Sequence, residues 1–437
     1  MIRHYLTPTS GSAPQTGGSK AEFSIPCGNL GLHLDPSQTV LSFTINNGNA
    51  GPMVLEGGAH TCIQSLNVYF GSVNISSIDE YGALFALVTD FTTDLDSLRS
   101  SGTVRGVADF LPTAVATPAN IKDSYYSRAG ATIAAGGSLM VALPFMSVLG
   151  TLAMKAIPLS QLQDSIKIEV KWAVQTNWGT YADAPSTLTG CTVSDIELQI
   201  SQVRLDGQVE KAMIDSLGGI VHCPTLDYSH FRSTVAPSAG FISMQIPIRV
   251  SQACNIFVIL RESAVTNGFS RKIISQRTKA GMIDYRFKLG ALVIPQTAIN
   301  CTGSAAEARM ELARAFGSGV ADAAARSCVF AELFLTDGYA LALSLAAFPS
   351  SDALSDGVST RNTHVVFESR ISSSNPSCYL DIFVMHEKLI VCQNGLMTTK
   401  IKHHVWIKNA IIDLFRSTMV STMIKNEIML EFLLDIY

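Results

Sequence analysis

The residues of this chain that could bind a metal or act as nucleophiles are its cysteines and histidines. The cysteines are scattered, their number is odd and none has the Cys-x-x-Cys spacing, so neither a zinc site nor a disulfide framework is predicted. They stand at positions 27, 62, 191, 223, 254, 301, 328, 378 and 392. Cys254 and Cys378 fall inside strand-like runs, where we expect reduced thiols buried as small hydrophobic groups. The pair His403 and His404 could bind a metal, but an exposed polar pair near a chain end is the simpler interpretation.

Carboxylates are the other candidates for acid–base chemistry, and each has a structural explanation. Asp79, Glu80 and Glu307 fall at expected helix N-termini, where negative charge is favourable. Asp381 and Glu387 lie in alternating strand patterns, which predicts solvent-facing side chains. The sequence holds none of the short motifs of metalloproteases, P-loop proteins, dinucleotide-binding proteins or α/β-hydrolases. We therefore predict no catalytic, cofactor-binding or metal-binding residue and no enzyme, although carboxylates gathered from distant strands would leave no local pattern.

Length, charge and hydropathy narrow the class of protein. A chain of 437 residues exceeds the size of one hydrophobic core, so at least two domains are expected. Hydrophobic residues make up 47% and charged residues only 15%, which leaves apolar surface beyond the needs of a monomer. The net charge of −4, without a cluster of Lys and Arg, predicts no specific nucleic-acid partner. No apolar run reaches the ~20 residues that span a bilayer, and the first residues lack the apolar segment of a signal peptide.

The same local pattern occurs once in each half of the chain. A strand-like run ends in a glycine at 65–71 and again at 284–290, and each is followed by a helix that opens with Ser-x-x-Glu. This spacing is a capping box, in which the serine oxygen accepts a backbone N–H and the glutamate reaches back to the serine N–H. It predicts Ser77 and Ser304 as helix N-caps. Two boxes at matching places indicate one fold that was built twice.

Short alternating runs bounded by turn residues indicate that most of the chain is β-structure. The clearest run places Ile166, Ile168, Val170 and Trp172 on one face and charged residues on the other. Each half holds many such strands, long loops and one helix between strands, which is typical of sandwiches and barrels. We predict an all-β protein of two tandem eight-stranded jelly rolls (a double jelly roll) with short helices in loops. The strand order is open at this point, because immunoglobulin-like sandwiches give a similar pattern.

Changes in composition divide the chain into four segments. Residues 1–21 are rich in Ser, Thr, Gly and Pro and are predicted to form a flexible N-terminal arm. Residues 22–217 should form the first jelly roll, which ends in a linking helix at 207–217, and residues 218–400 the second. Residues 401–437 are richer in Lys, Ile, Met and Leu, and they form either a helical C-terminal tail with an apolar face or a segment foreign to the protein.

Three stretches carry a resemblance to a known family. They are Ile-Pro-Leu-Ser-Gln-Leu at 157–162 with the alternating strand after it, Tyr-Arg-Phe-Lys-Leu-Gly-Ala-Leu-Val-Ile-Pro at 285–295, and Leu-Asp-Ile-Phe-Val-Met-His-Glu-Lys-Leu-Ile-Val-Cys-Gln-Asn-Gly at 380–395. Through them, the chain over residues 22–400 resembles the double jelly-roll major capsid proteins of tailless icosahedral viruses. It is most similar to the polinton, adintovirus and virophage group, with adenovirus hexon and tailless-phage capsid proteins as distant relatives.

The resemblance implies a structural role. A major capsid protein of this family forms pseudo-hexagonal trimeric capsomers of an icosahedral shell, so the expected partners are a homotrimer, neighbouring capsomers, and penton and minor capsid proteins. In the family the N-terminus faces inward, often near an inner membrane. The protein would be assembled inside the host cell and found in the virion. The family has no catalytic residues to carry over and uses no cofactor.

Two other functions are compatible with a tandem β-sandwich. One is a carbohydrate-binding protein, which would expose Trp and Tyr on one sheet face, although the chain has only three tryptophans, at 172, 178 and 406. The other is a glycoside-processing enzyme on a jelly-roll scaffold, which would need two carboxylates that face each other across a groove. A stable trimer in solution would favour the capsid protein, and a monomer would favour either of these alternatives.

Overall fold

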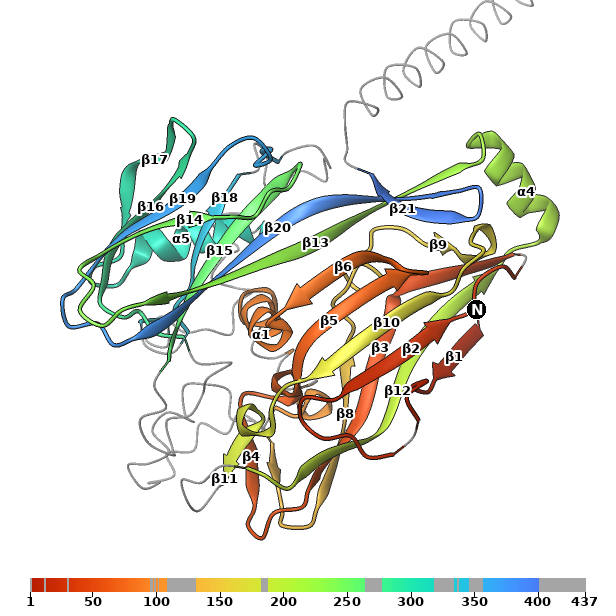
Figure 1. Ribbon diagram of the computed structural model, residues 1–437, viewed down its shortest axis with the longest axis horizontal. Helices are drawn as coiled ribbons and strands as arrows, with labels where there is room; N and C mark the ends of the chain where they lie inside the picture. The colour runs from red at the N-terminus through yellow and green to blue at the C-terminus, as the bar shows by residue number, and fades with distance from the viewer. Residues whose placement is uncertain are drawn as a thin grey trace, which may run out of the picture. The chain divides into compact units, whose positions relative to one another are not determined.

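The strand order repeats between the two halves of the chain in the computed structural model (Figure 1). The structure describes residues 2–11, 13–29, 31–94, 97, 100, 102–107, 131–181, 188–263, 277–317, 334–335, 338–345 and 357–400. Both halves belong to one compact unit, Met1–Thr399. The tail predicted at 401–437, with its His403 and His404, lies outside the described residues.

The first half forms two main antiparallel sheets. One follows the order β1-β12-β3-β8, with β9 paired to β3, and the other the order β2-β10-β5-β6. A small sheet, β11-β4-β7, lies in the same half. The strands are β1 (Ile2–Leu6), β2 (Lys20–Ile25), β3 (Leu32–Asn47), β4 (Met53–Leu55), β5 (Ile63–Phe70), β6 (Val73–Asp79), β7 (Thr132–Ile133), β8 (Ser138–Pro144), β9 (Ile157–Pro158), β10 (Ile166–Trp172), β11 (Gly179–Tyr181) and β12 (Cys191–Arg204).

The second half forms two sheets of the same kind. One follows the order β13-β20-β15-β18, with β21 paired to β20, and the other the order β14-β19-β16-β17. The strands are β13 (Ile220–Val235), β14 (Phe241–Ile246), β15 (Ala253–Glu262), β16 (Met282–Leu289), β17 (Leu292–Asn300), β18 (Leu341–Ser344), β19 (Val365–Ile371), β20 (Cys378–Gln393) and β21 (Leu396–Lys400).

The two halves match strand for strand. In the first sheets, β1, β12, β3 and β8 correspond to β13, β20, β15 and β18, and in the second sheets β2, β10, β5 and β6 correspond to β14, β19, β16 and β17. Apart from the pairs β5-β6, β16-β17 and β20-β21, neighbours in each sheet come from distant parts of the sequence, which is the connectivity of a jelly roll. The prediction of an all-β double jelly roll is therefore confirmed, and the immunoglobulin-like alternative is not the fold observed.

Alternation along β10 places one face in the core of the first roll. Ile166, Ile168, Val170 and Trp172 are buried, whereas the charged residues between them face outward, as the sequence predicts. The indole of Trp172 packs edge-on against Phe43 of β3, with 5.1 Å between the ring centroids. This contact joins the two sheets of the first roll.

The hairpin and helix that carry the repeated sequence pattern occupy equivalent places in the two rolls. Gly71 (φ 56°) joins β5 to β6, and Gly290 (φ 61°) joins β16 to β17, a left-handed conformation that glycine adopts without strain. Helices α1 (Tyr81–Thr92) and α5 (Ala306–Ala315) follow. Each helix is preceded by a residue in the left-handed conformation, Glu80 (φ 52°) and Ala305 (φ 48°). The duplication inferred from the sequence is thus present in the backbone itself.

The predicted serine caps are wrong. Ser77 belongs to β6, and its Oγ donates to Asn67 Oδ1 at 2.7 Å. Neither α1 nor α5 has a side-chain cap, because the left-handed residue that precedes each helix takes the cap position. Glu307 does reach backward, but its carboxylate accepts the backbone N–H of Asn300 at 2.8 Å instead of that of Ser304.

The prediction of a flexible arm is wrong for Ile2–Leu6. These residues form β1, which pairs antiparallel with β12 at the edge of the first sheet. Gln15 exchanges backbone hydrogen bonds with Val193 at 2.7 and 2.8 Å, and its side chain accepts from Trp172 Nε1 at 2.6 Å. The composition indicated little apolar burial, but the segment is held by backbone pairing, which composition does not report.

The chain passes from the first roll to the second through α4 (Gly207–Ser216), at the place of the predicted linking helix. The Asp206 side chain caps α4 by accepting the backbone N–H of Gln208 at 2.9 Å. The division of the chain at 217/218 stays a prediction. Short 3-10 turns complete the described chain: η1 (Ala59–Cys62), η2 (Thr103–Arg105), η4 (Leu159–Gln161) and η5 (Gln175–Asn177). Among the described helices, none is both long and apolar enough to cross a membrane.

Candidate functional site: the contact between the two rolls

Backbone pairing joins the two rolls where the segment between β8 and β10 meets β13. Ala153 forms an antiparallel bridge with Thr225. The N–H of Leu226 donates to the carbonyl of Leu152 at 3.0 Å. On the other side of the bridge, the N–H of Met154 donates to the carbonyl of Pro224 at 3.2 Å. A second contact lies further along this segment, where the N–H of residue 163 donates to the carbonyl of residue 395 at 2.9 Å. The two rolls therefore share hydrogen bonds of the kind found within a sheet.

A buried ionic network forms the centre of the contact. Asp381 of β20 is fully buried, and its carboxylate lies 2.7 Å from Arg261 Nη2 and 2.8 Å from both Arg232 Nε and His230 Nε2. All four residues belong to the second roll. Glu80 of the first roll completes the network, because its Oε2 lies 2.7 Å from Arg232 Nη2 and 3.0 Å from Arg261 Nη2. Two arginines are thus held between carboxylates from different rolls.

The electrostatics of the network favour an ionised Asp381. Burial by itself would raise the pKa of this carboxyl, but the charge of Arg261, the hydrogen bond with His230 and the charge of Arg232 outweigh it and hold the pKa far below its usual range. For the Arg232 guanidinium, burial would lower the pKa, and the charges of Asp381 and Glu80 raise it instead. Asp381 is the fully buried carboxylate of the network, so its removal would leave buried Arg261 with only Glu80 as a charged partner.

Two smaller polar contacts lie on either side of this network. Ser76 Oγ of β6 donates to Asp227 Oδ1 of β13 at 2.7 Å, and the other oxygen of Asp227 pairs with Lys388 Nζ at 2.8 Å. At the end of α1, Asp90 forms an ion pair with buried Arg277 of the second roll. The first roll therefore contacts the second along the length of β6 and α1.

The structure corrects the sequence interpretation of two acidic residues, Glu80 and Asp381. Glu80 does not complete a capping box, because its left-handed backbone directs the side chain to the arginines of the second roll. Asp381 does not face solvent, because the first roll covers the outer face of its sheet. Glu387 is only half-buried, although it too lies on β20. Sequence reasoning missed Arg232 and Arg261 altogether.

Replacement of Ser77 by Ala is expected to change the free energy of unfolding by less than about 0.5 kcal/mol. The reason is that Ser77 is exposed and bonds Asn67, and an exposed hydrogen bond of this kind adds little stability. Urea denaturation of the purified protein measures the change. A loss near the ~1 kcal/mol typical of a helix cap would restore the original cap assignment.

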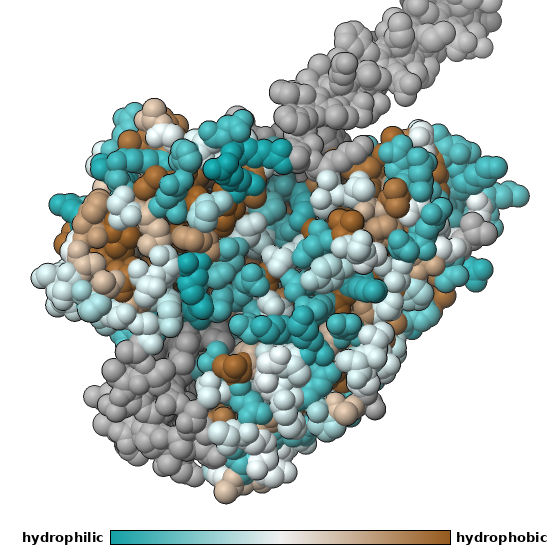
Figure 2. Space-filling view, in the orientation of Figure 1, coloured by the Kyte–Doolittle hydropathy of each residue, from teal (hydrophilic) through white to brown (hydrophobic). Residues whose placement is uncertain are grey.

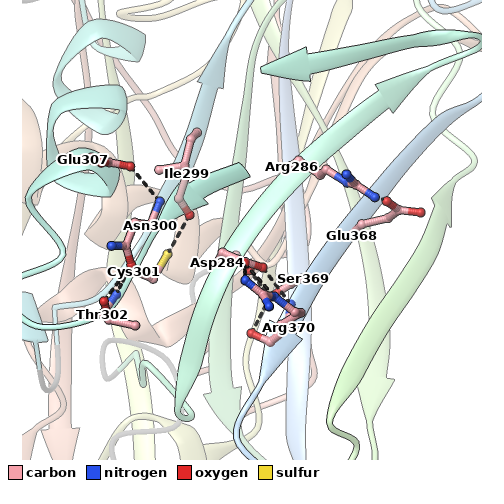
Figure 3. Close-up of polar contacts among 10 residues, drawn as sticks. All are labelled: Asp284, Arg286, Ile299, Asn300, Cys301, Thr302, Glu307, Glu368, Ser369 and Arg370. Atoms are coloured by element: carbon pink, nitrogen blue, oxygen red, sulfur yellow. Dashed lines mark hydrogen bonds and ion pairs between the residues drawn. The ribbon is translucent and has the colours of Figure 1, made fainter. Parts of the chain in front are cut away.

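A second repeated feature lies on the outer faces of the sheets β2-β10-β5-β6 and β14-β19-β16-β17. Glu368 of β19 accepts from Arg286 Nε at 2.8 Å, across the register pair that these residues form (Figure 3). In the first roll Glu169 of β10 accepts from Asn67 Nδ2 at 3.0 Å across the equivalent pair, and from Lys20 Nζ at 2.9 Å. The central strand of each outer face thus carries a glutamate that bonds the neighbouring strand.

Figure 3 shows that this polar face extends along β16 and β19 in the second roll. Lys288 Nζ donates to the second oxygen of Glu368 at 2.6 Å, and its hydrogen bond, with that of Arg286, outweighs burial and lowers the pKa of Glu368. Arg370 Nε donates to Asp284 Oδ2 at 2.7 Å. These are cross-strand pairs on a solvated surface, and they stabilise sheet pairing by small amounts.

Several further residues that the sequence singles out are buried where the structure describes them. Cys254 and Cys378 are buried, as predicted. Within the part of the chain that the structure describes, no group of three or more His, Cys, Asp or Glu side chains could hold a metal ion. Trp172 and Trp178 are fully buried and cannot form a carbohydrate-binding surface, and Trp406 lies outside the described residues.

The fold is shared with solved structures of viral capsid proteins. The PBCV-1 protein VP54, fitted into a reconstruction of the virophage Sputnik, has a TM-score of 0.63 and 12% identity over 92% of this chain and 97% of that chain. The Faustovirus major capsid protein has a TM-score of 0.59 and 10% identity over 89% and 90%, and the mavirus major capsid protein 0.51 and 11% over 91% and 90%.

Sequence comparison adds nothing to this structural likeness. No protein-family model matches the chain, and no curated protein matches its sequence. The structural likeness covers both rolls, because it extends over most of each chain compared. The chain therefore has the double jelly-roll fold that these major capsid proteins share, as its sequence predicts.

Proposed function

We propose that the protein is a structural major capsid protein, whose homotrimers form pseudo-hexagonal capsomers of an icosahedral virus shell. The observation that carries the proposal is that the chain contains two rolls with the same strand order, which are held together by a buried ionic contact. A trimer of such a chain presents six similar rolls around one axis, so it can pack in a near-hexagonal lattice. The fold likeness to major capsid proteins supports the same function.

The proposal assigns partners and a location. The partners are two further copies of the chain, neighbouring capsomers, and penton and minor capsid proteins, and the location is the capsid of the virion. A protein of this kind needs a rigid relation between its rolls more than it needs a reactive site. The shared backbone hydrogen bonds and the buried network around Asp381 supply that rigidity.

The two rival functions receive less support. A carbohydrate-binding protein would expose aromatic residues, but Trp172 and Trp178 are buried in the first roll. A glycoside-processing enzyme would place two carboxylates across a groove, whereas the buried carboxylates of Asp381 and Asp227 are each held by cationic side chains. Carboxylates that are each held by a cationic side chain in this way do not face each other across a groove, as that enzyme would require.

The purified protein is expected to be a trimer in solution. Obligate interfaces of this class bury more than about 2,000 Å², so the trimer should persist on dilution. Size-exclusion chromatography with multi-angle light scattering measures the mass, and negative-stain electron microscopy should show particles of near-hexagonal outline. A protein that stays monomeric at its highest soluble concentration would contradict the proposal and favour one of the rivals.

A further inference from the structure

The linking helix α4 contacts the first roll through an acidic side chain. The buried residue of α4 is Glu210, whose carboxylate accepts the backbone N–H of Gly31 at 2.7 Å and the hydroxyl of Ser160. Ile214, the next residue on this side of the helix, is half-buried. A surface helix ordinarily buries its apolar side chains and exposes its charges. In α4 this arrangement is reversed, because a carboxylate is buried.

The apolar side chains of α4 form a stripe that faces solvent. Val209 is 58% exposed and Met213 is 37% exposed, and Leu217, the C-cap of the helix, is 50% exposed. Residues at this spacing lie on one side of an α-helix. The small residues Ala212 and Ser216 border the stripe and are exposed as well. We call these five residues the α4 face.

The charged side chains of α4 lie away from this face. At about 100° of turn per residue, Lys211 and Asp215 each lie about 160° around the helix from Met213. The α4 face is therefore uncharged from Val209 to Leu217. A continuous apolar and uncharged side of a helix is the kind of surface that packs against another protein.

The place of α4 in the fold makes the α4 face accessible to a neighbouring molecule. Figure 1 draws α4 outside the sheets of both rolls, beside the turn that joins β20 to β21. Ile220, which follows α4, pairs with Gln393 at that turn, and Leu396 beyond the turn is 54% exposed. Figure 2 shows hydrophobic side chains among hydrophilic ones in the region where Figure 1 draws α4 and β21.

The length of α4 also indicates that its apolar side packs against a partner. A helix of 10 residues is marginal in water by itself, and most helix stability in proteins comes from the packing of an apolar face. The buried side chain of α4 is polar, so the apolar side is left for another molecule to cover.

The charge of α4 does not suit a lipid bilayer. Helices that lie on membranes carry several Lys or Arg residues beside their apolar face. From Asp206 to Leu217 the chain holds three acidic residues and one lysine, a net charge of −2. Anionic headgroups would repel this charge. A protein surface that is itself apolar and uncharged fits the α4 face better.

The α4 face is complementary to a second copy of itself. In an antiparallel pair of helices centred on Met213, this residue meets its own equivalent, and Val209 of each copy lies opposite Leu217 of the other. Ala212 and Ser216 are small enough for the two helices to approach closely. Since Lys211 and Asp215 point away, no like charges meet. One surface can therefore supply both sides of the contact, as in an isologous interface.

We propose that the α4 face docks on the α4 face of a second copy of this chain, which belongs to a neighbouring capsomer. The inference rests on the proposed function, because five side chains bury much less than the ~1,200 Å² of a stable interface. Such a contact cannot hold two free chains together. It becomes effective between capsomers, where several copies of the contact act at once.

A charge placed at the centre of the α4 face tests the proposal. Wild-type trimers should associate further as they are concentrated, and sedimentation velocity measures this association. Met213→Glu should still form trimers with an unchanged melting temperature, but should need at least about tenfold higher concentration to associate, because the contact would bury two like charges. Lys211→Glu, a larger change of charge on the opposite side of the same helix, is the matched control and should associate like wild type. If Met213→Glu fails to fold, Val209→Glu replaces it.

Cross-linking tests whether the helix pairs with itself. In associated samples, a short bismaleimide should join Met213→Cys chains into covalent dimers on a denaturing gel. Lys211→Cys should give no more dimer than wild type, whose native cysteines set the background. Equal cross-linking of both variants, or none at Met213→Cys, would overturn the proposed pairing.

The remaining outcomes separate the inference from the proposed function. Wild-type trimers that do not associate, or Met213→Glu trimers that associate like wild type, would overturn the inference and leave the proposed function standing. Binding of wild type, but not of Met213→Glu, to vesicles of phosphatidylcholine and phosphatidylserine would show that the occupant is a bilayer and the inference is wrong. A monomeric wild type would overturn the proposed function itself.

Discussion

Replacing Asp381 by Asn is expected to lower the free energy of unfolding by about 3–5 kcal/mol at neutral pH, the cost of breaking a buried ion pair. Asp381 is fully buried and holds Arg261, Arg232 and His230. Asparagine keeps the shape of the side chain but removes the charge that compensates buried Arg261. Urea denaturation followed by tryptophan fluorescence and by circular dichroism measures the loss. The same change at exposed Asp79 is the control and should have little effect.

The pH dependence gives a second measure of the same network. The folded-state pKa of Asp381 lies below the unfolded value of about 3.9, so its stabilising contribution is complete above that pH and is lost as the pH falls. The stability difference between wild type and Asp381→Asn should be constant at neutral pH and should shrink once the pH drops below about 4. A difference that grows on acidification would show that Asp381 is not an ionised partner of the arginines.

Replacing Trp172 by Ala should destabilise the first roll by about 3–5 kcal/mol, as expected for a large aromatic side chain removed from a core. The ring is fully buried against Phe43, which joins the two sheets, and its Nε1 donates to Gln15 in the N-terminal segment. The substitution therefore leaves a cavity between the sheets and also releases the segment that runs from β1 to β2.

Trp172→Phe is the matched comparison, because it keeps most of the packing and loses the hydrogen bond to Gln15. We expect it to cost less than about 2 kcal/mol. Thermal melting followed by near-ultraviolet circular dichroism compares the two variants with wild type. Equal losses in both variants would mean that the hydrogen bond to Gln15, and not the packing against Phe43, dominates.

Much of the fold could be predicted because most strands have one buried and one solvated face. In β10 this produces clean alternation, which located Trp172 in the core. The repeated Ser-x-x-Glu pattern correctly predicted that the fold is duplicated, although the serines do not cap the helices. It marks the place where β6 and β17 lead into helices, but the residues that start the helices are Glu80 and Ala305 in left-handed conformations.

The wrong predictions came from rules of alternation and composition, which describe side chains and take no account of backbone pairing or of what covers a sheet. Residues Ile2–Leu6 bury little, yet they are held by the backbone of β12. Asp381 alternates like a solvent-facing residue, but a whole roll covers its sheet. The sequence did hold a signal for this cover, because β15 is apolar on both faces, which indicates a strand that is buried on both sides. Asp381 of β20 pairs with Ile259 of β15, so it lies in the same covered sheet.

The contact between rolls could not have been predicted from local sequence. Its partners, Glu80, Arg232, Arg261 and Asp381, come from four separate elements, and each has an ordinary role when it is considered alone. Only the register of β13, β15 and β20 brings the two arginines beside one carboxylate. The fourth member arrives from the other roll, where its backbone conformation is set by the start of α1.

The contact between the rolls has a consequence for how the protein unfolds. If the first roll separated from the second or unfolded first, Arg232 and Arg261 would lose the carboxylate of Glu80 and keep only that of Asp381. The loss of one roll therefore weakens the other, so the two rolls are expected to unfold in one transition rather than in two.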